Sequence, residues 1–410
     1  MNFKKPLAAL SIPAFRNFII GRFLFIMSLR MMGTLVGWWV YELTGDPLAL
    51  GLIGLSEVIP AVSMALYAGH VVDMNDRKKM ILRSVTAYTI CLLTLFIISF
   101  LDKGNQSIRF WILAGIFSII FCSGLIRAFS GPSFGATIGH LVPQALLPNA
   151  TAWSQGSWLM ASVIGHGIVG FFIAALGING SLGIILSLCV IALMIFLKLP
   201  DIPPPPATES KTWDRVKEGI RFVWKTKTLL AAMSLDLFAV LLGGAVALLP
   251  VFAKEILKVG PVEFGWLNAA GDLGAILVVS SLLILPLSKN QGNILIITVF
   301  GFGASIVIFG LSTSFWLSLF ALFMAGVLDG FSIVIRGTIL QLQTPAHLRG
   351  RVLSVNSMFI NSSNELGQFE SGVTARIFGT APSVILGGCL TMAVAVISWL
   401  KAKDLRKLEY

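Results

Sequence analysis

The sequence predicts an all-α integral membrane protein with twelve transmembrane helices in two pseudo-symmetric six-helix bundles. Its 410 residues are only 12% charged, whereas a soluble globular protein carries about 25% charged residues. Its apolar residues fall in continuous runs of roughly 20, the length that a membrane-spanning helix needs. Because these runs do not alternate with polar residues, they favour helices over the strands of a membrane barrel. A repeat between the two halves is the third indication.

The apolar segments and the positions of the basic residues predict the topology. With twelve spans both termini lie on one side, and most Lys and Arg residues fall on that side. The positive-inside rule makes it the cytoplasmic side of the cell (inner) membrane. The net charge of +11 is then a topology signal, and nucleic acid is excluded as a partner. The spans are expected near residues 17–41, 49–72, 80–101, 109–139, 152–177, 180–199, 229–253, 263–286, 293–312, 314–341, 352–377 and 382–400.

A polar stretch divides the chain nearly in half. It reads "PDIPPPPATESKTWDRVKEGIRFVWKTK", and its proline run cannot be helical. The hydrophobic residues after the prolines recur with the helical period, which predicts an amphipathic helix at the membrane surface. We therefore expect an N-terminal six-helix bundle at 1–200, a cytoplasmic linker containing this helix at 201–228, and a C-terminal six-helix bundle at 229–410.

The two halves contain matching segments. "GLIRAFSGPSFGATIGHLVPQAL" (124–146) aligns without gaps on "GVLDGFSIVIRGTILQLQTPAHL" (326–348). A second pair, "GDPLALGL" and "VGPVEFGW", falls at equivalent loops of a six-plus-six count. Such repeats are typical of secondary transporters, whose substrate site lies near the membrane midplane. The alignment also sets Arg127 opposite Asp329. Because charges inside a membrane are costly and usually functional, we favour a role for both in the translocation path over a purely structural one.

The loop between spans two and three carries a recognisable motif, "GHVVDMNDRKK". It resembles the loop signature of the major facilitator superfamily, in which Gly69, Asp73, Arg77 and Lys78 match. The signature usually has a glycine at the position of Asp76. An acidic residue at this position resembles the enterobactin-exporter and drug-efflux subfamily. The stretches "LVPQALLPNATA", "VKEGIRFV" and "TPAHLRGRVLSV" fit the same subfamily. The resemblance covers essentially the whole chain and implies the major facilitator fold.

The resemblance also implies a task for this loop. Gly69 would allow a close helix approach, and Asp73 would face the positive N-terminus of span eleven. Arg77 and Lys78 would pair across the cytoplasmic seam, with Asp76 as a further partner. The five residues would then form a gating motif that latches the outward-facing state. The alternative is an ordinary basic cytoplasmic loop.

Span five departs from the family pattern. Antiporters of the superfamily often carry a Gly-Pro-x-x-Gly kink there, but this chain reads "IGHGIVG". Gly165 and Gly170 still permit close packing, while His166 replaces the proline and weakens the antiport inference from this motif. His166 is either a coupling residue, since histidine titrates near physiological pH, or a hydrogen-bonded core residue.

Several polar residues inside predicted spans are candidates for the path. On span eleven, four of them share one face at about 100° per residue, which predicts a cavity or else hydrogen bonds between helices. On span ten, Asp329, Ser332 and Arg336 form a stripe, in which Arg336 can also snorkel to the membrane surface. Asp236 and Arg22 are further intramembrane charges. Arg30 of span one and His166 of span five are also candidates for the path. The four candidates of span eleven are Asn361, Asn364, Glu365 and Gln368.

A proton-coupled exporter needs a carboxylate that changes its protonation state as access switches. Such a carboxylate suits a site near an arginine at the midplane, because burial and the arginine act on it in opposite directions. Our ordered candidates are Asp329 with Arg127, then Glu365, Asp272 and Glu57.

The pattern predicts a transporter and not an enzyme. We find no ATP-binding loop, nucleophile elbow or metal-ligand spacing, so we expect no cofactor and no metal. We expect a monomer that exports a small amphipathic molecule, a drug-like compound or siderophore, in exchange for protons. The alternatives are a lysophospholipid translocator of the same fold and a transport-inactive sensor.

Overall fold

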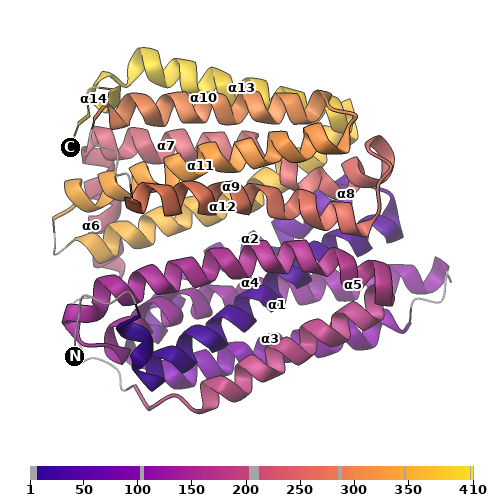
Figure 1. Ribbon diagram of the computed structural model, residues 1–410, viewed down its shortest axis with the longest axis horizontal. Helices are drawn as coiled ribbons and strands as arrows, with labels where there is room; N and C mark the ends of the chain where they lie inside the picture. Colours follow the sequence, from indigo (N-terminus) through magenta and orange to yellow (C-terminus); the bar gives the residue numbers. More distant parts are fainter. Residues whose placement is uncertain are drawn as a thin grey trace. The chain divides into compact units, whose positions relative to one another are not determined.

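The computed structural model describes residues 7–101, 106–202, 212–284, 289–345, 348–406 and 408–409. Within these ranges the regular structure is helical and contains no strand (Figure 1). The longer helices are α1 (Pro13–Thr44), α2 (Pro47–Met74), α3 (Arg77–Ser99), α4 (Gln106–Leu141), α5 (Leu147–Leu197), α6 (Thr212–Lys225), α7 (Lys227–Leu242), α9 (Pro261–Ile284), α10 (Gln291–Leu311), α11 (Phe315–Gln343), α12 (Arg349–Phe378) and α13 (Thr380–Lys401). Two short helices are α8 (Leu249–Val251) and α14 (Lys403–Arg406).

The described helices account for the twelve expected spans. Ten helical segments are long and apolar enough to cross a membrane by length and composition. One of them contains α5, whose 51 residues include a non-helical Gly177 with φ 66° and ψ −173°. Glycine adopts this positive φ at little cost, so α5 is two helices joined at Gly177. Adding α12, whose polar residues lower its mean hydropathy, gives twelve and confirms the predicted fold class.

The chain forms two compact units. Unit 1 comprises residues 1–39 and 59–209, and unit 2 comprises residues 40–58 and 210–410. The boundary after residue 209 falls in the segment expected to be the linker. Residues 40–58, which span the end of α1 and the start of α2, group with unit 2 rather than with the expected N-terminal bundle.

Helices α1 and α5 run side by side in unit 1, along the same direction. Arg22 of α1 donates to the Ser154 carbonyl at 3.1 Å, and Thr34 Oγ1 lies 2.5 Å from His166 Nδ1. Just before α1, the Ala9 N–H donates to Asn149 Oδ1 of α5. Buried aromatic rings of α1, α4 and α5 pack against one another in the same unit. They belong to Phe18, Phe25, Phe134 and Phe196.

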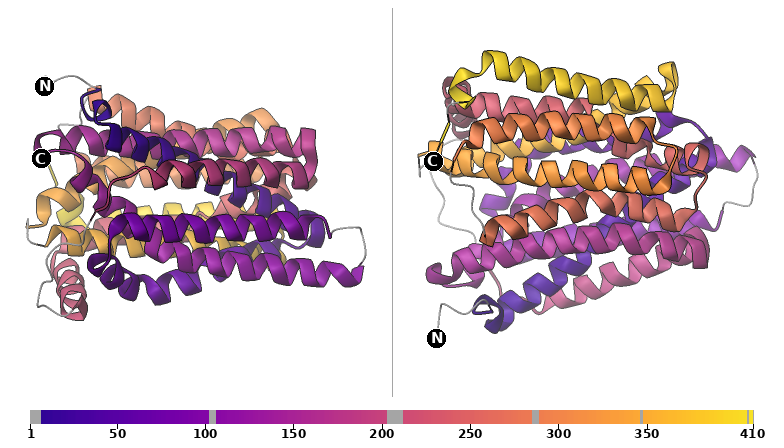
Figure 2. Two further views of the ribbon diagram at one scale, coloured as in Figure 1. Left: turned by 90° about the horizontal axis from the view of Figure 1, so that it is seen from below. Right: turned by 45° about the horizontal axis from the view of Figure 1, so that its top comes forward.

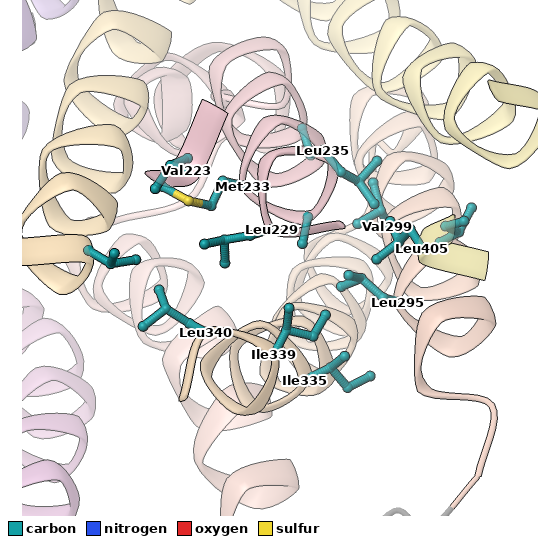
Figure 3. Packing of buried hydrophobic residues seen from close by; sticks show 14 of the residues in the cluster. Val223, Leu229, Met233, Leu235, Leu295, Val299, Ile335, Ile339, Leu340 and Leu405 are labelled. Carbon is teal, nitrogen blue, oxygen red and sulfur yellow. The ribbon is translucent and has the colours of Figure 1, made fainter. Parts of the chain in front are cut away.

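In unit 2, α10 packs against α11 and α13, and α11 packs against α9 (Figures 1 and 2). Apolar side chains of α6, α7, α10, α11 and α14 meet at one end of these helices (Figure 3). Val223 of α6 is among them and is 1% exposed, and burial of such a side chain stabilises by about 1.5–3 kcal/mol. The predicted amphipathic helix α6 therefore contributes Val223, with Phe222 packed beside it, to the core of unit 2.

Helices α9 and α11 are in backbone contact at Gly271 and Gly326. A Cβ atom on Gly326 would lie 1.9 Å from the Gly271 carbonyl oxygen. We expect Gly326→Ala to separate the helices and to lower the free energy of unfolding by about 1–3 kcal/mol, the usual effect of overpacking. Thermal unfolding of the purified protein measures this loss. Gly337→Ala is the matched control on α11, because a Cβ there meets nothing within 4 Å; an equal loss in both variants would contradict the packing explanation.

Candidate functional site

A buried ion-pair cluster lies in unit 2. The guanidinium of Arg336 on α11 forms a salt bridge with the carboxylate of Asp236 on α7 and lies 3.9 Å from the carboxylate of Asp329. Its Nε atom also donates to Ser332 Oγ at 3.1 Å. The side chains of Arg336 and Asp236 are only 12% and 7% exposed. Two carboxylates and a hydroxyl therefore hold one buried guanidinium.

The local fold explains why these residues meet. Asp329, Ser332 and Arg336 lie three, four and seven residues apart, so they share one face of α11. Helix α7 packs against α11 and supplies Asp236. Asp272 on α9 is close enough for its charge to act on Asp329. Asp236 and Asp329 share one guanidinium, and like charges that lie close together disfavour full ionisation, so this cluster contains a candidate for the uptake and release of a proton.

A small pocket borders the cluster, and the two carboxylates nearest to Arg336 differ in their exposure. The side chain of Asp329 is 38% exposed, whereas that of Asp236 is only 7% exposed. Asp329 is therefore the more accessible carboxylate of this pair. The pocket is lined by Asp236, Ala239, Val240, Thr298, Val299, Phe302, Leu328, Asp329 and Ser332.

This arrangement favours the stripe over the alternative that the sequence left open for Arg336. The residue does not snorkel away from the helix core but pairs with Asp236, whose role in this cluster the sequence did not reveal. The stripe of Asp329, Ser332 and Arg336 was visible as a spacing on one helix. The expected pairing of Asp329 with Arg127 would join residues of different units, and it stays a prediction. Arg127 itself is half-buried on α4.

The gating motif begins at the end of α2 and continues into α3. Asp76 is the N-cap of α3, because its carboxylate accepts the Lys79 N–H at 3.0 Å. Arg77 is buried and contacts His140 on α4, and Lys78 lies 3.1 Å from the Asp201 carboxylate. Within unit 1 these charges are thus held by the start of α3 itself, by α4 and by Asp201 beyond the end of α5. Gly69 and Asp73 lie in α2, and their contacts are outside the described side chains.

The gating hypothesis predicts that Asp73→Asn loses transport while the protein still folds. The amide keeps the size of the carboxylate but removes the charge that would meet a helix N-terminus. Transport by membrane vesicles and thermal unfolding measure the two properties. Asp404→Asn is the control, because it makes the same change at an exposed carboxylate outside the motif. Full transport by Asp73→Asn would contradict the hypothesis.

The polar residues of α12 lie at the boundary between its buried and exposed sides. Glu365 is buried and accepts a hydrogen bond from Gln368 Nε2 at 3.3 Å. Asn361 and Asn364 are exposed, and the Asn364 amide donates to the Ile360 carbonyl at 2.9 Å. Whether this face lines a path stays a prediction. The other carboxylate candidates, Glu57 on α2 and Asp272 on α9, are half-buried.

The segment 40–58 meets α12 within unit 2. A Cβ on Gly51 would lie 3.0 Å from the Gly372 Cα, so the two helix backbones are in contact. Arg376 at the end of α12 donates to the Asp46 carboxylate at 2.9 Å. The start of α2 is therefore fixed to α12 by close backbone packing and an ion pair.

In unit 1 the predicted path residues Arg30 and His166 lie on the contact between α1 and α5. The Arg30 guanidinium carbon lies 4.9 Å from the centroid of the Trp158 ring, a distance typical of a cation–π contact. His166 is half-buried beside Thr34. Among the residues that the structure describes, no group of three His, Cys, Asp or Glu side chains could hold a metal ion.

Comparisons with known proteins identify the class of this protein. The model of the Major Facilitator Superfamily matches residues 18–368, and the chain belongs to this family. It is a multi-pass membrane transporter.

Two curated relatives are named enterobactin exporter EntS. The protein of Shigella boydii serotype 4 (strain Sb227) is 25% identical over 97% of this chain and 94% of its own length. The protein of Escherichia coli O81 (strain ED1a) is also 25% identical, with the same coverage.

Solved structures share the fold at low sequence identity. A POT family transporter in complex with 5-aminolevulinic acid has a TM-score of 0.74 at 12% identity, with 96% of each chain covered. The nucleoside transporter NupG has a TM-score of 0.68 at 14% identity, with 95% of this chain and 99% of its own covered.

Proposed function

We propose that this transporter exports a small amphipathic organic molecule across the cytoplasmic membrane in exchange for protons. The similarity to enterobactin exporters over 97% of the chain supports export and makes a siderophore or drug-like compound the first substrate to test. The observation that supports proton coupling is the buried cluster of Asp236, Arg336 and Asp329. The proposed protein is a monomer with both termini in the cytoplasm.

The cluster can couple a proton to a change of contacts in a simple way. When Asp329 is ionised, it attracts Arg336 in competition with Asp236. When a proton binds Asp329, that attraction is lost and Arg336 stays with Asp236 alone. Such a two-position ion pair gives the protein two states that differ in proton binding. Antiport requires that substrate favours the state without the proton, so substrate affinity should fall as pH falls.

The gating motif has a separate role in this proposal. Asp73, together with Arg77 and Lys78, latches the outward-facing state, and release of the latch opens the cytoplasmic side. Proton binding at the cluster and release of the latch are then two parts of one alternating-access cycle.

Transport into inside-out membrane vesicles tests the proposal. Export from the cell corresponds to uptake by these vesicles, so an acidic lumen should drive uptake of enterobactin as protons leave. We expect faster uptake with the acidic lumen, loss of this acceleration with a protonophore, and no effect in vesicles that lack the protein. A panel of lipophilic cations and macrolides extends the test if enterobactin is not the substrate.

The same vesicles separate the alternatives. Uptake that ignores the pH gradient would contradict proton coupling. Movement of fluorescent lysophospholipid between leaflets, with no uptake of soluble compounds, would favour the lipid translocator. Binding without any transport would favour a sensor.

A further inference from the structure

The charged residues inside the predicted membrane spans are distributed unequally between the two units. The helical segments 13–39, 59–72, 80–99, 106–141 and 147–197 of unit 1 contain no Asp or Glu, but they do contain arginines. The carboxylates inside the predicted spans belong to unit 2 and include Glu57, Asp236, Asp272, Asp329, Glu365 and Glu370. An arginine inside a membrane is costly unless something balances its charge. Unit 1 therefore has no carboxylate of its own inside these segments that could balance an arginine, and each arginine is considered by its own contacts.

Arg30 occupies a defined position among these arginines. A Cβ atom on Gly165 would lie 2.9 Å from the Met27 carbonyl oxygen and 3.1 Å from the Arg30 Cβ. Only a glycine allows α1 and α5 to approach so closely, and the approach brings Arg30 over the Trp158 ring at 4.9 Å. The guanidinium is thus oriented by packing and by an aromatic ring.

The neighbouring positive or polar groups on the same helix contact have hydrogen-bond partners. Arg22 donates to the Ser154 carbonyl at 3.1 Å, and His166 lies beside Thr34. Arg30 differs from them, because none of the described side chains forms an ion pair or hydrogen bond with it. Its contact with Trp158 leaves the donors of the guanidinium available for an acceptor.

We propose that this face of α1 and α5 binds an organic anion that carries an aromatic ring. A carboxylate or phenolate group of the ligand would accept hydrogen bonds from Arg30, which suits the planar donor geometry of a guanidinium. The ring of the ligand would contact Trp158 beside it. The identification of this ligand with the exported substrate rests on the proposed function.

Three compounds with one ring system and different charges test the inference. They are 1-naphthoate, the neutral 1-naphthamide and the cationic 1-naphthylmethylamine. Binding to the purified full-length protein in detergent is measured by thermal shift and by microscale thermophoresis at pH 7.5. We expect 1-naphthoate to bind at least about tenfold more tightly than the amide, since one charge-assisted hydrogen bond is worth that much, and the amine to bind more weakly than the amide.

Variants identify the residue responsible. Arg30→Gln should remove the preference for the anion and leave the affinity for the amide unchanged, whereas Arg30→Lys should restore part of the preference. Arg83→Gln is the matched control, because Arg83 is an exposed base on α3 and its loss should change nothing. The apparent melting temperature without ligand shows which variants fold.

Two results would overturn the inference. One is that 1-naphthoate binds no more tightly than 1-naphthamide to the wild-type protein. The other is a preference for the anion that persists in a folded Arg30→Gln variant. Binding in detergent needs no transport, so a protein that prefers anions but exports nothing would contradict the proposed function and leave this inference standing.

Discussion

Replacing Asp329 with asparagine is expected to abolish the acceleration of transport by a pH gradient. The amide has the size of the carboxylate, so α11 and the pocket beside it should keep their packing. It cannot bind or release a proton, and it removes the charge that lies 3.9 Å from Arg336. Uptake by inside-out vesicles should therefore proceed at the same low rate with and without an acidic lumen.

A carboxylate far from the cluster provides the control for this experiment. Asp404 is exposed on α14, and Asp404→Asn should transport like the wild-type protein. If Asp329→Asn kept its full response to the pH gradient, Asp329 would not be the coupling residue. Glu365, Asp272 and Glu57 would then be tested in that order.

Replacing Arg336 with methionine is expected to cause the largest loss of stability among the substitutions considered. Methionine is similar in length but leaves the buried carboxylate of Asp236 without its partner. Removing one member of a buried ion pair typically costs about 3–5 kcal/mol. The free energy of unfolding, or the apparent melting temperature in detergent, measures the effect.

A second substitution tests whether the unbalanced charge is the cause. In the double variant Arg336→Met, Asp236→Asn the buried carboxylate is absent, so much of the lost stability should return. Stability that is unchanged by Arg336→Met would show that the guanidinium extends to the membrane surface, as the sequence allowed. If the double variant were no more stable than Arg336→Met, the loss of stability would come from altered packing and not from the unpaired carboxylate.

The number of helices could be predicted from hydropathy because the bilayer requires long apolar segments. Hydropathy alone does not predict two features of the fold. The polar residues of α12 lower its mean hydropathy below that of the other spans, and its place in the fold follows only from the count of six plus six. The assignment of residues 40–58 to unit 2 depends on contacts such as Gly51 with Gly372, which no local pattern encodes.

The candidate site was only partly predictable for a related reason. Spacing along α11 indicated that Asp329 and Arg336 share a face, because the helical period is regular. The pairing of Arg336 with Asp236 joins residues 100 positions apart and depends on how α7 packs against α11. Likewise, the loop motif indicated Arg77 as a candidate, but not its burial against His140 of α4.

The central claim is that substrate and protons move in opposite directions, and lumenal pH in proteoliposomes tests it most directly. The purified protein is reconstituted with a pH-sensitive dye inside, without an initial pH gradient, and labelled enterobactin is added outside. We predict that the lumen becomes more alkaline as enterobactin enters, and that Asp329→Asn shows no such change. Entry of enterobactin through the wild-type protein at constant lumenal pH would contradict the claim.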